Sequence, residues 1–139
     1  MQIYDFERGQ MEYKILLVED NIYKAVDIKR ALGACGTMNI THVGFFEDAL
    51  EKLEEDATFD LIITDMCYPL YRGEDTDDEA GFKLIEYLKT MQYEIPVVIC
   101  STSNYENVVK IFGVVWYSEL SDIKRDFKRI IEKLQYEIK

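Results

Sequence analysis

The sequence predicts one α/β domain in which a parallel β-sheet carries helices on both faces. Short apolar runs alternate with amphipathic stretches five times along the 139 residues. Regular alternation of this kind is typical of strand–helix units joined by right-handed crossovers. The connections are short and neither an internal repeat nor a linker marks a boundary, so we expect residues 1–139 to form a single domain.

The strands are predicted from nearly continuous apolar runs. Residues 15–18 read Ile-Leu-Leu-Val and residues 61–63 read Leu-Ile-Ile. Continuous apolar character, without alternation, indicates strands that are buried on both faces, as in a parallel sheet. The predicted strands are 13–18, 40–46, 59–64, 95–100 and 114–117.

The helices are predicted from apolar residues at three- and four-residue spacing. The first predicted helix has such a stripe at Ile22, Ala25, Ile28 and Leu32. The last begins near Ser121-Asp122, two suitable N-cap residues, and is amphipathic. The predicted helices are 22–32, 47–56, 82–91, 105–112 and about 121–134.

Charge and cysteine content limit the class of protein. Acidic residues outnumber basic ones by 27 to 16, for a net charge of -11. Nucleic acids and anionic membranes require a basic face, so neither is an expected partner. The three cysteines are not arranged in CxxC pairs, which favours reduced thiols. No signal peptide and no apolar run of about 18 residues is present, so we expect a cytoplasmic protein.

Acidic residues follow two of the predicted strands. Glu19 and Asp20 follow the first strand, Asp65 follows the third, and the hydroxyl of Ser101 follows the fourth. Parallel sheets bind ligands at this edge. Single acids at strand ends are usually solvated loop residues, but three that converge would repel one another unless a cation joined them. Their oxygens suit Mg²⁺, and a carboxylate beside Mg²⁺ can attack phosphorus.

Four segments in this order resemble the receiver domains of two-component response regulators. They are Ile15–Asn21, Leu61–Asp65 with Pro69 four residues later, Ile95–Ser101 and Gly113–Tyr117. The resemblance covers about residues 12–137. It implies a flavodoxin-like doubly wound (βα)5 fold, a three-layer sandwich with parallel sheet order 2-1-3-4-5.

The resemblance also implies a phosphoacceptor site. Asp65 would take a phosphoryl group from a histidine kinase or a phosphotransfer protein. Mg²⁺ would be the cofactor, held by Glu19, Asp20, Asp65 and the backbone carbonyl of Cys67. Such a domain is a self-phosphorylating acceptor and not a turnover enzyme.

Further positions match residues that respond to the modification. The hydroxyl of Ser101 would bind a phosphoryl oxygen, and Tyr117 would be the aromatic residue that turns inward. Cys67 and Ser103 match positions that tune dephosphorylation in the family. The signal would pass to a downstream protein partner, and we expect a monomer or weak homodimer.

The sequence departs from the family at two places. The family carries a lysine three residues after the switch aromatic, and Leu120 stands there. Lys124, about one helical turn further on, could reach back, although a surface charge is the simpler interpretation. An acidic insertion occupies about residues 70–80, with Arg72 to Glu79 as its most charged part. We interpret it as a solvated loop, with a partner-docking role as the alternative.

Two other functions compete with phosphorylation-dependent signalling. One is a degenerate pseudo-receiver that acts as an interaction module without phosphorylation, which Leu120 and the acidic insertion favour. The other is a haloacid-dehalogenase-like phosphatase, which also has an aspartyl nucleophile after a strand. That family requires a second Asp two residues later, where this sequence has Cys67.

Overall fold

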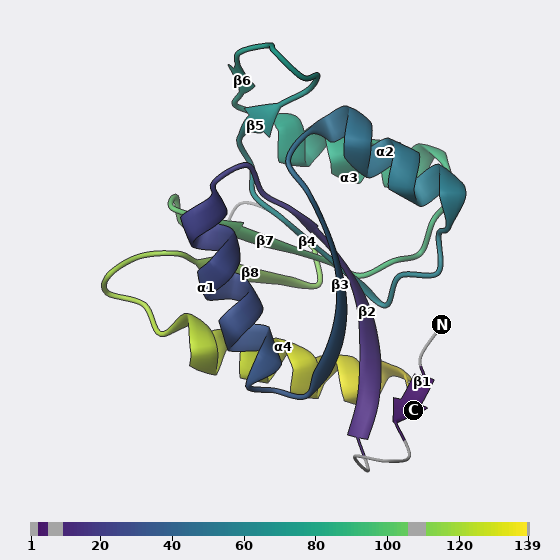
Figure 1. Cartoon of the computed structure of the whole chain (residues 1–139), viewed down its shortest axis with the longest axis vertical. Coiled ribbons are helices and arrows are strands. Elements are labelled where there is room, and N and C mark those ends of the chain that lie inside the picture. The colour runs from purple at the N-terminus through teal and green to yellow at the C-terminus, as the bar shows by residue number, and fades with distance from the viewer. Residues whose placement is uncertain (1–2, 6–9, 106–110, 139) are drawn as a thin grey trace.

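The computed structural model describes residues 3–5, 10–105 and 111–138, and these fold into three layers (Figure 1). The strands are β1 (Ile3–Asp5), β2 (Gln10–Val18), β3 (Thr37–Val43), β4 (Leu61–Thr64), β5 (Tyr68–Pro69), β6 (Thr76–Asp77), β7 (Val97–Ser101) and β8 (Gly113–Trp116). The helices are α1 (Ile22–Gly33), α2 (Phe46–Glu55), α3 (Ala80–Thr90) and α4 (Ile123–Ile138).

The parallel sheet has the order β3-β2-β4-β7-β8. This is the predicted 2-1-3-4-5 arrangement of a flavodoxin-like fold, and the prediction is confirmed. Val18 pairs with both Val43 and Thr64, and Thr64 pairs with Ile99. Because of this register, the carboxyl ends of the central strands lie at one edge of the sheet.

The helices form one layer on each face of the sheet. Helices α1 and α4 cover one face and α2 and α3 cover the other (Figure 1). The central strands are buried on both sides as predicted: all four residues of β4 and all five of β7 are inaccessible or nearly so. For β3 and β8 the prediction is wrong, because most of their residues are only partly buried. Strand residues therefore contribute to both hydrophobic clusters, one on each face of the sheet.

Two short pieces of structure were not predicted. Strand β1 pairs antiparallel with the start of β2. Within the acidic insertion, β6 pairs antiparallel with β5, so this segment contains a small hairpin rather than only irregular loop. Gly73 lies at its turn with φ of 85°, a conformation that favours glycine. The hairpin is held to α3 by an ion pair of 2.5 Å between Asp77 and Lys83.

Two other predictions concern helices. The predicted helix 105–112 contains residues 106–110, which lie outside the described residues. The apolar stripe predicted for α1 was expected to face the core, and this is wrong for its first residue. Ile22 is 71% exposed, whereas Lys24 is buried. No helix in the described part of the chain is long and apolar enough to cross a membrane.

Candidate functional site

Three carboxylates converge at the carboxyl edge of the sheet. Glu19 and Asp20 follow β2, and Asp65 follows the adjacent strand β4. One oxygen from each of the three carboxylates lies within 4.8 Å of the others. The Asp65 amide donates to the Val18 carbonyl at 3.1 Å, which continues the strand pairing into the site. The juxtaposition expected from the sequence is therefore present.

Glu19 is the most deeply buried of the three acids, with 2% of its surface exposed. Its amide donates to the Val43 carbonyl, and the Nε2 of His42 donates to the Glu19 carbonyl at 2.8 Å. The side-chain Oε2 accepts from the Asn21 amide at 3.1 Å. Burial raises the pKa of the Glu19 carboxyl, an effect that the ammonium of Lys24 opposes.

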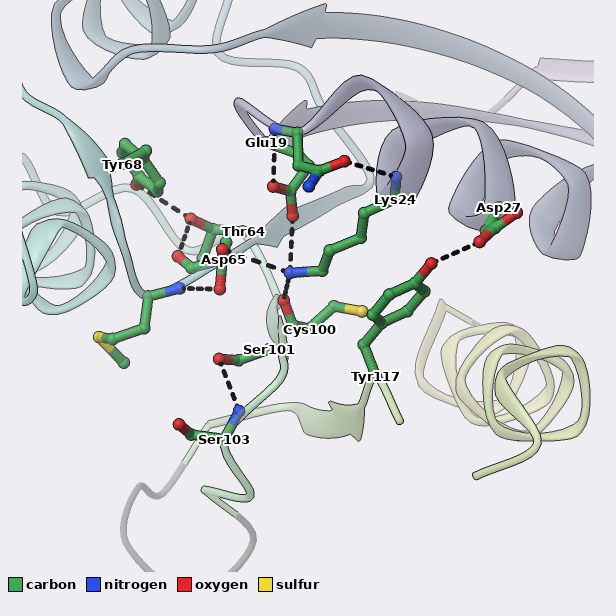
Figure 2. Close-up of polar contacts among 12 residues, drawn as sticks. Glu19, Lys24, Asp27, Thr64, Asp65, Tyr68, Cys100, Ser101, Ser103 and Tyr117 are labelled. Atoms are coloured by element: carbon green, nitrogen blue, oxygen red, sulfur yellow. Dashed lines mark hydrogen bonds and ion pairs between the residues drawn. The ribbon is translucent and has the colours of Figure 1, made fainter. Parts of the chain in front are cut away.

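Asp65 is held by the loop that follows it. Its Oδ1 accepts from the Met66 amide at 2.7 Å. Its carbonyl accepts from the hydroxyl of Thr64 at 2.7 Å, and the buried phenol of Tyr68 donates to that same hydroxyl at 2.9 Å (Figure 2). The backbone on both sides of Asp65 is thus fixed, while 15% of its side chain remains accessible.

Gly81 allows α3 to pack directly against this loop. A Cβ at position 81 would lie 2.7 Å from the Asp65 carbonyl oxygen and 3.0 Å from the Cα of Met66. Real Cβ contacts are not this short, so only glycine fits without movement of the backbone. The Gly81 amide also donates to the Met66 carbonyl at 2.9 Å.

Asp20 is the exposed member of the cluster. Desolvation raises the pKa of its carboxyl, and the neighbouring charge of Asp65 adds to the increase. Burial is the main cause of the raised pKa of both Glu19 and Asp20; the charge of Asp65 adds to each increase and the ammonium of Lys24 opposes it. A converging set of oxygen ligands fits a hard divalent cation such as Mg²⁺.

One cation of the chain already lies in this cluster, and the sequence analysis missed it. The Nζ of Lys24 lies 2.7 Å from Oε1 of Glu19 and 3.3 Å from Oδ2 of Asp65. It also donates to the Cys100 carbonyl at 2.7 Å (Figure 2). Burial acts to lower the pKa of Lys24, but the attraction of Asp65 and Glu19 outweighs it and the pKa is raised. The ammonium therefore stays charged although it is buried.

Helix periodicity is the signal that could have identified Lys24. The Asn21 side chain caps α1 by accepting from the Lys24 amide at 3.1 Å. Position 24 precedes Ile28 by four residues and Ala31 by seven, so all three lie on the inner face of α1. A lysine in such a stripe is normally interpreted as a boundary residue with a solvated head.

Ser101 and Tyr117 come from the two strands beyond β4: Ser101 ends β7 and Tyr117 follows β8. Ser101, the last residue of β7, is buried, and its Oγ accepts from the Ser103 amide at 3.2 Å (Figure 2). The Tyr117 amide donates to the Ser101 carbonyl at 2.8 Å. The Tyr117 phenol donates to Asp27 on α1, and this contact raises its pKa to about 12. The Nζ of Lys24 lies 5.7 Å from the centre of the Tyr117 ring.

Leu120, which stands where the resemblance predicts a lysine, has its side chain in solvent. Leu120 is 87% exposed. Its turn is closed by Ser121, whose hydroxyl donates to the Ser118 carbonyl and accepts from the Ser118 amide. Lys124 is exposed and lines a cleft of about 740 Å³ together with Asp27 and Tyr117. In the described part of the chain, the ammonium in contact with Asp65 is that of Lys24 and not that of Lys124.

Cys67 is partly exposed, and its thiol donates to the Asp78 carbonyl at 3.7 Å. Burial and the charges of Asp65 and Asp78 raise the pKa of the thiol. The thiolate is therefore disfavoured, and the contribution expected of this residue is that of its backbone carbonyl.

Comparison with known proteins identifies the family. No protein-family model matches the chain. The rice (Oryza sativa) two-component response regulator ORR3 is 34% identical over 95 residues, which span 67% of this chain and 66% of the rice protein. The chain belongs to the receiver domains of two-component response regulators.

Solved structures agree with this fold at low sequence identity. The signal receiver domain of a LuxO repressor protein from Vibrio parahaemolyticus superposes with a TM-score of 0.69 at 18% identity, covering 90% of this chain and 92% of that one. RcsB from Salmonella enterica, bound to a promoter in the presence of the phosphomimetic BeF3-, gives 0.69 at 17% identity over 89% of this chain. This chain covers 62% of RcsB, so the likeness concerns only part of that protein.

Proposed function

We propose that this receiver domain accepts a phosphoryl group on Asp65 from a histidine kinase or a phosphotransfer protein. The observation that carries the proposal is the convergence of Glu19, Asp20 and Asp65 within 4.8 Å at the carboxyl edge of the sheet. Asp65 combines a fixed backbone with an accessible carboxylate, as a nucleophile requires.

Mg²⁺ is the cofactor that we propose for this transfer. The carboxylates of Glu19, Asp20 and Asp65 and the backbone carbonyl of Cys67 would hold it. Three carboxylates and the single ammonium of Lys24 leave two negative charges uncompensated, which a divalent cation balances. When bound, Mg²⁺ would neutralise the charge that develops on the phosphoryl oxygens.

Ser101 and Tyr117 would convert the modification into a change of surface. The buried hydroxyl of Ser101 would bind a phosphoryl oxygen, and Tyr117, whose amide is bonded to the Ser101 carbonyl, would respond to its movement. Cys67 and Ser103 would tune the rate of dephosphorylation. Output would then pass through protein–protein contacts of a cytoplasmic monomer or weak homodimer. The domain would be an acceptor rather than a turnover enzyme, with no nucleic acid or membrane as partner.

The alternative is a pseudo-receiver that binds partners without being phosphorylated. Leu120 favours it, because the exposed side chain brings no charge to the site. The phosphorylated receiver and the pseudo-receiver have the same fold, so only a phosphorylation experiment distinguishes the two functions.

The test is direct phosphorylation of the purified chain. The protein is incubated with phosphoramidate, with and without Mg²⁺, and its intact mass is recorded beside an Asp65→Asn variant. We expect one phosphoryl adduct that requires Mg²⁺ and is absent from the variant. No adduct with phosphoramidate, together with no binding of BeF3- in the presence of Mg²⁺, contradicts the proposal and favours the pseudo-receiver.

A further inference from the structure

The buried ammonium of Lys24 lies beside the carboxylate of Asp65, the group that the proposed phosphorylation modifies. It contacts three elements at once: Glu19 after β2, Asp65 after β4 and the Cys100 carbonyl in β7. Only 5% of the Lys24 side chain is accessible, so the ammonium is surrounded by protein atoms rather than by solvent. Figure 2 shows its side chain extending from α1 across the sheet edge to these three partners.

This placement is built by the local sequence. The Asn21 cap starts α1 immediately after Asp20, and position 24 then falls in the first turn on the inner face of the helix. The aliphatic chain packs within the core face of α1, while the ring of Tyr117 lies beside the ammonium. The partners fix Nζ in position before any ligand binds. A preorganised charge of this kind needs little rearrangement when a transition state forms.

We infer that Lys24, from α1, is the residue that neutralises the phosphoryl group on Asp65, in place of a lysine from the loop after β8. The inference rests on the proposed phosphorylation of Asp65. The loop cannot provide this charge at position 120, since Leu120 is apolar and 87% exposed. With Lys24 in this role, the absence of the usual lysine does not make the domain a pseudo-receiver.

The chemical step assigns a defined task to this charge. A carboxylate oxygen of Asp65 forms a bond to phosphorus as the P–N bond of the donor breaks. The nitrogen leaves with that electron pair, as neutral ammonia when the donor is phosphoramidate with a protonated amino group. Three phosphoryl oxygens then carry the negative charge. The ammonium of Lys24, 3.3 Å from Oδ2 of Asp65 at the start, contacts one of them.

A second role of Lys24 makes the opposite prediction. The ammonium could take the place of the metal and hold Glu19 and Asp65 in an inactive ion-paired cluster. Removal of the charge would then increase both Mg²⁺ binding and phosphorylation. If Lys24 instead acts on the phosphoryl group, its removal increases Mg²⁺ affinity, because the cluster becomes more negative, but slows phosphorylation.

The test compares Lys24→Met with Lys29→Met, the same change at an exposed lysine of α1. Circular dichroism checks that each variant is folded. Calorimetric titration measures the Mg²⁺ dissociation constant, and intact mass follows phosphorylation by phosphoramidate at saturating Mg²⁺. For Lys24→Met we expect tighter Mg²⁺ binding and a rate of adduct formation lower by about 10²-fold, the size of losing one preorganised donor. Lys29→Met should match the wild type in both.

The outcomes separate the two proposals. An adduct that forms in Lys24→Met at the wild-type rate or faster overturns the role of Lys24 and leaves the phosphorylation of Asp65 intact. No adduct and no BeF3- binding in the wild type overturns both. If Lys24→Met does not fold, Lys24→Gln replaces it, because its amide can still donate to the Cys100 carbonyl without a charge. The same slower rate is expected for it.

Discussion

The contact between α3 and the Asp65 loop leads to a quantitative prediction for Gly81→Ala. The added Cβ would lie 2.7 Å from the Asp65 carbonyl oxygen and 3.0 Å from the Cα of Met66. Both are backbone atoms, so the contact cannot be relieved by rotating a side chain. Overpacking of this kind costs about 1–3 kcal/mol, and the better helix propensity of alanine returns up to about 1 kcal/mol. We expect a net loss of up to about 2 kcal/mol in the free energy of unfolding.

Gly33→Ala is the matched control for this prediction. Gly33 is also a helical glycine, the last residue of α1, but no atom lies within 4 Å of a Cβ built there. Its replacement should be neutral or stabilising by roughly 0.5–1 kcal/mol. Urea unfolding followed by circular dichroism measures both variants, and the Mg²⁺ affinity of Gly81→Ala should fall because the Asp65 backbone must move. A Gly81→Ala variant as stable as Gly33→Ala would refute the view that this packing is rigid.

Three further predictions concern the charges of the site. Because the pKa of Glu19 is raised above its ordinary 4.5, its contribution to stability is fully present below pH 4.5 and is lost as the pH rises through the folded-state value. Urea unfolding without Mg²⁺ should therefore show that the free energy of unfolding of the wild type declines as the pH rises above 4.5, and that Glu19→Gln lacks this decline. If the free energies of the two proteins change in parallel with pH, the prediction is contradicted. Mg²⁺ at 100 times its dissociation constant should stabilise the wild type by about 2.7 kcal/mol, and the same Mg²⁺ concentration should stabilise Asp20→Asn less, as thermal unfolding can measure. Asp27→Asn should lower the pKa of Tyr117 from about 12 towards its ordinary 10, and an ultraviolet pH titration that gives the same tyrosine ionisation curve for both proteins would disprove the contact.

The strands and the order of the site residues could be predicted because they follow from local patterns. The run Ile15–Val18 is apolar on both faces, and such a strand is stable only between two helical layers. Once the strands are parallel, the residues after them, Glu19, Asp65 and Ser101, must lie at one edge. The pairing of Val18 with Thr64 in the structure realises that expectation.

The acidic insertion could not be predicted in the same way. Its composition is typical of a solvated loop, and nothing local indicates that Thr76–Asp77 pairs with Tyr68–Pro69. Strands of two residues have no periodicity to detect. Asp77 of the hairpin also forms an ion pair with Lys83 of the following helix, a contact that the local sequence does not indicate.

By itself the sequence determined a doubly wound domain with three acids and a hydroxyl at its carboxyl edge, because burial patterns and strand ends are local properties. Only the tertiary structure decided which positive charge faces Asp65. Lys24 and Lys124 are both lysines near the start of a helix; the helical period places Lys24 on the inner face of α1, but it does not show that the ammonium is buried or what it contacts. The packing of α1 across β2 and β7 buries Lys24 between Glu19, Asp65 and the Cys100 carbonyl. A buried ammonium is stable only where such partners surround it, and three separate strand ends supply them here.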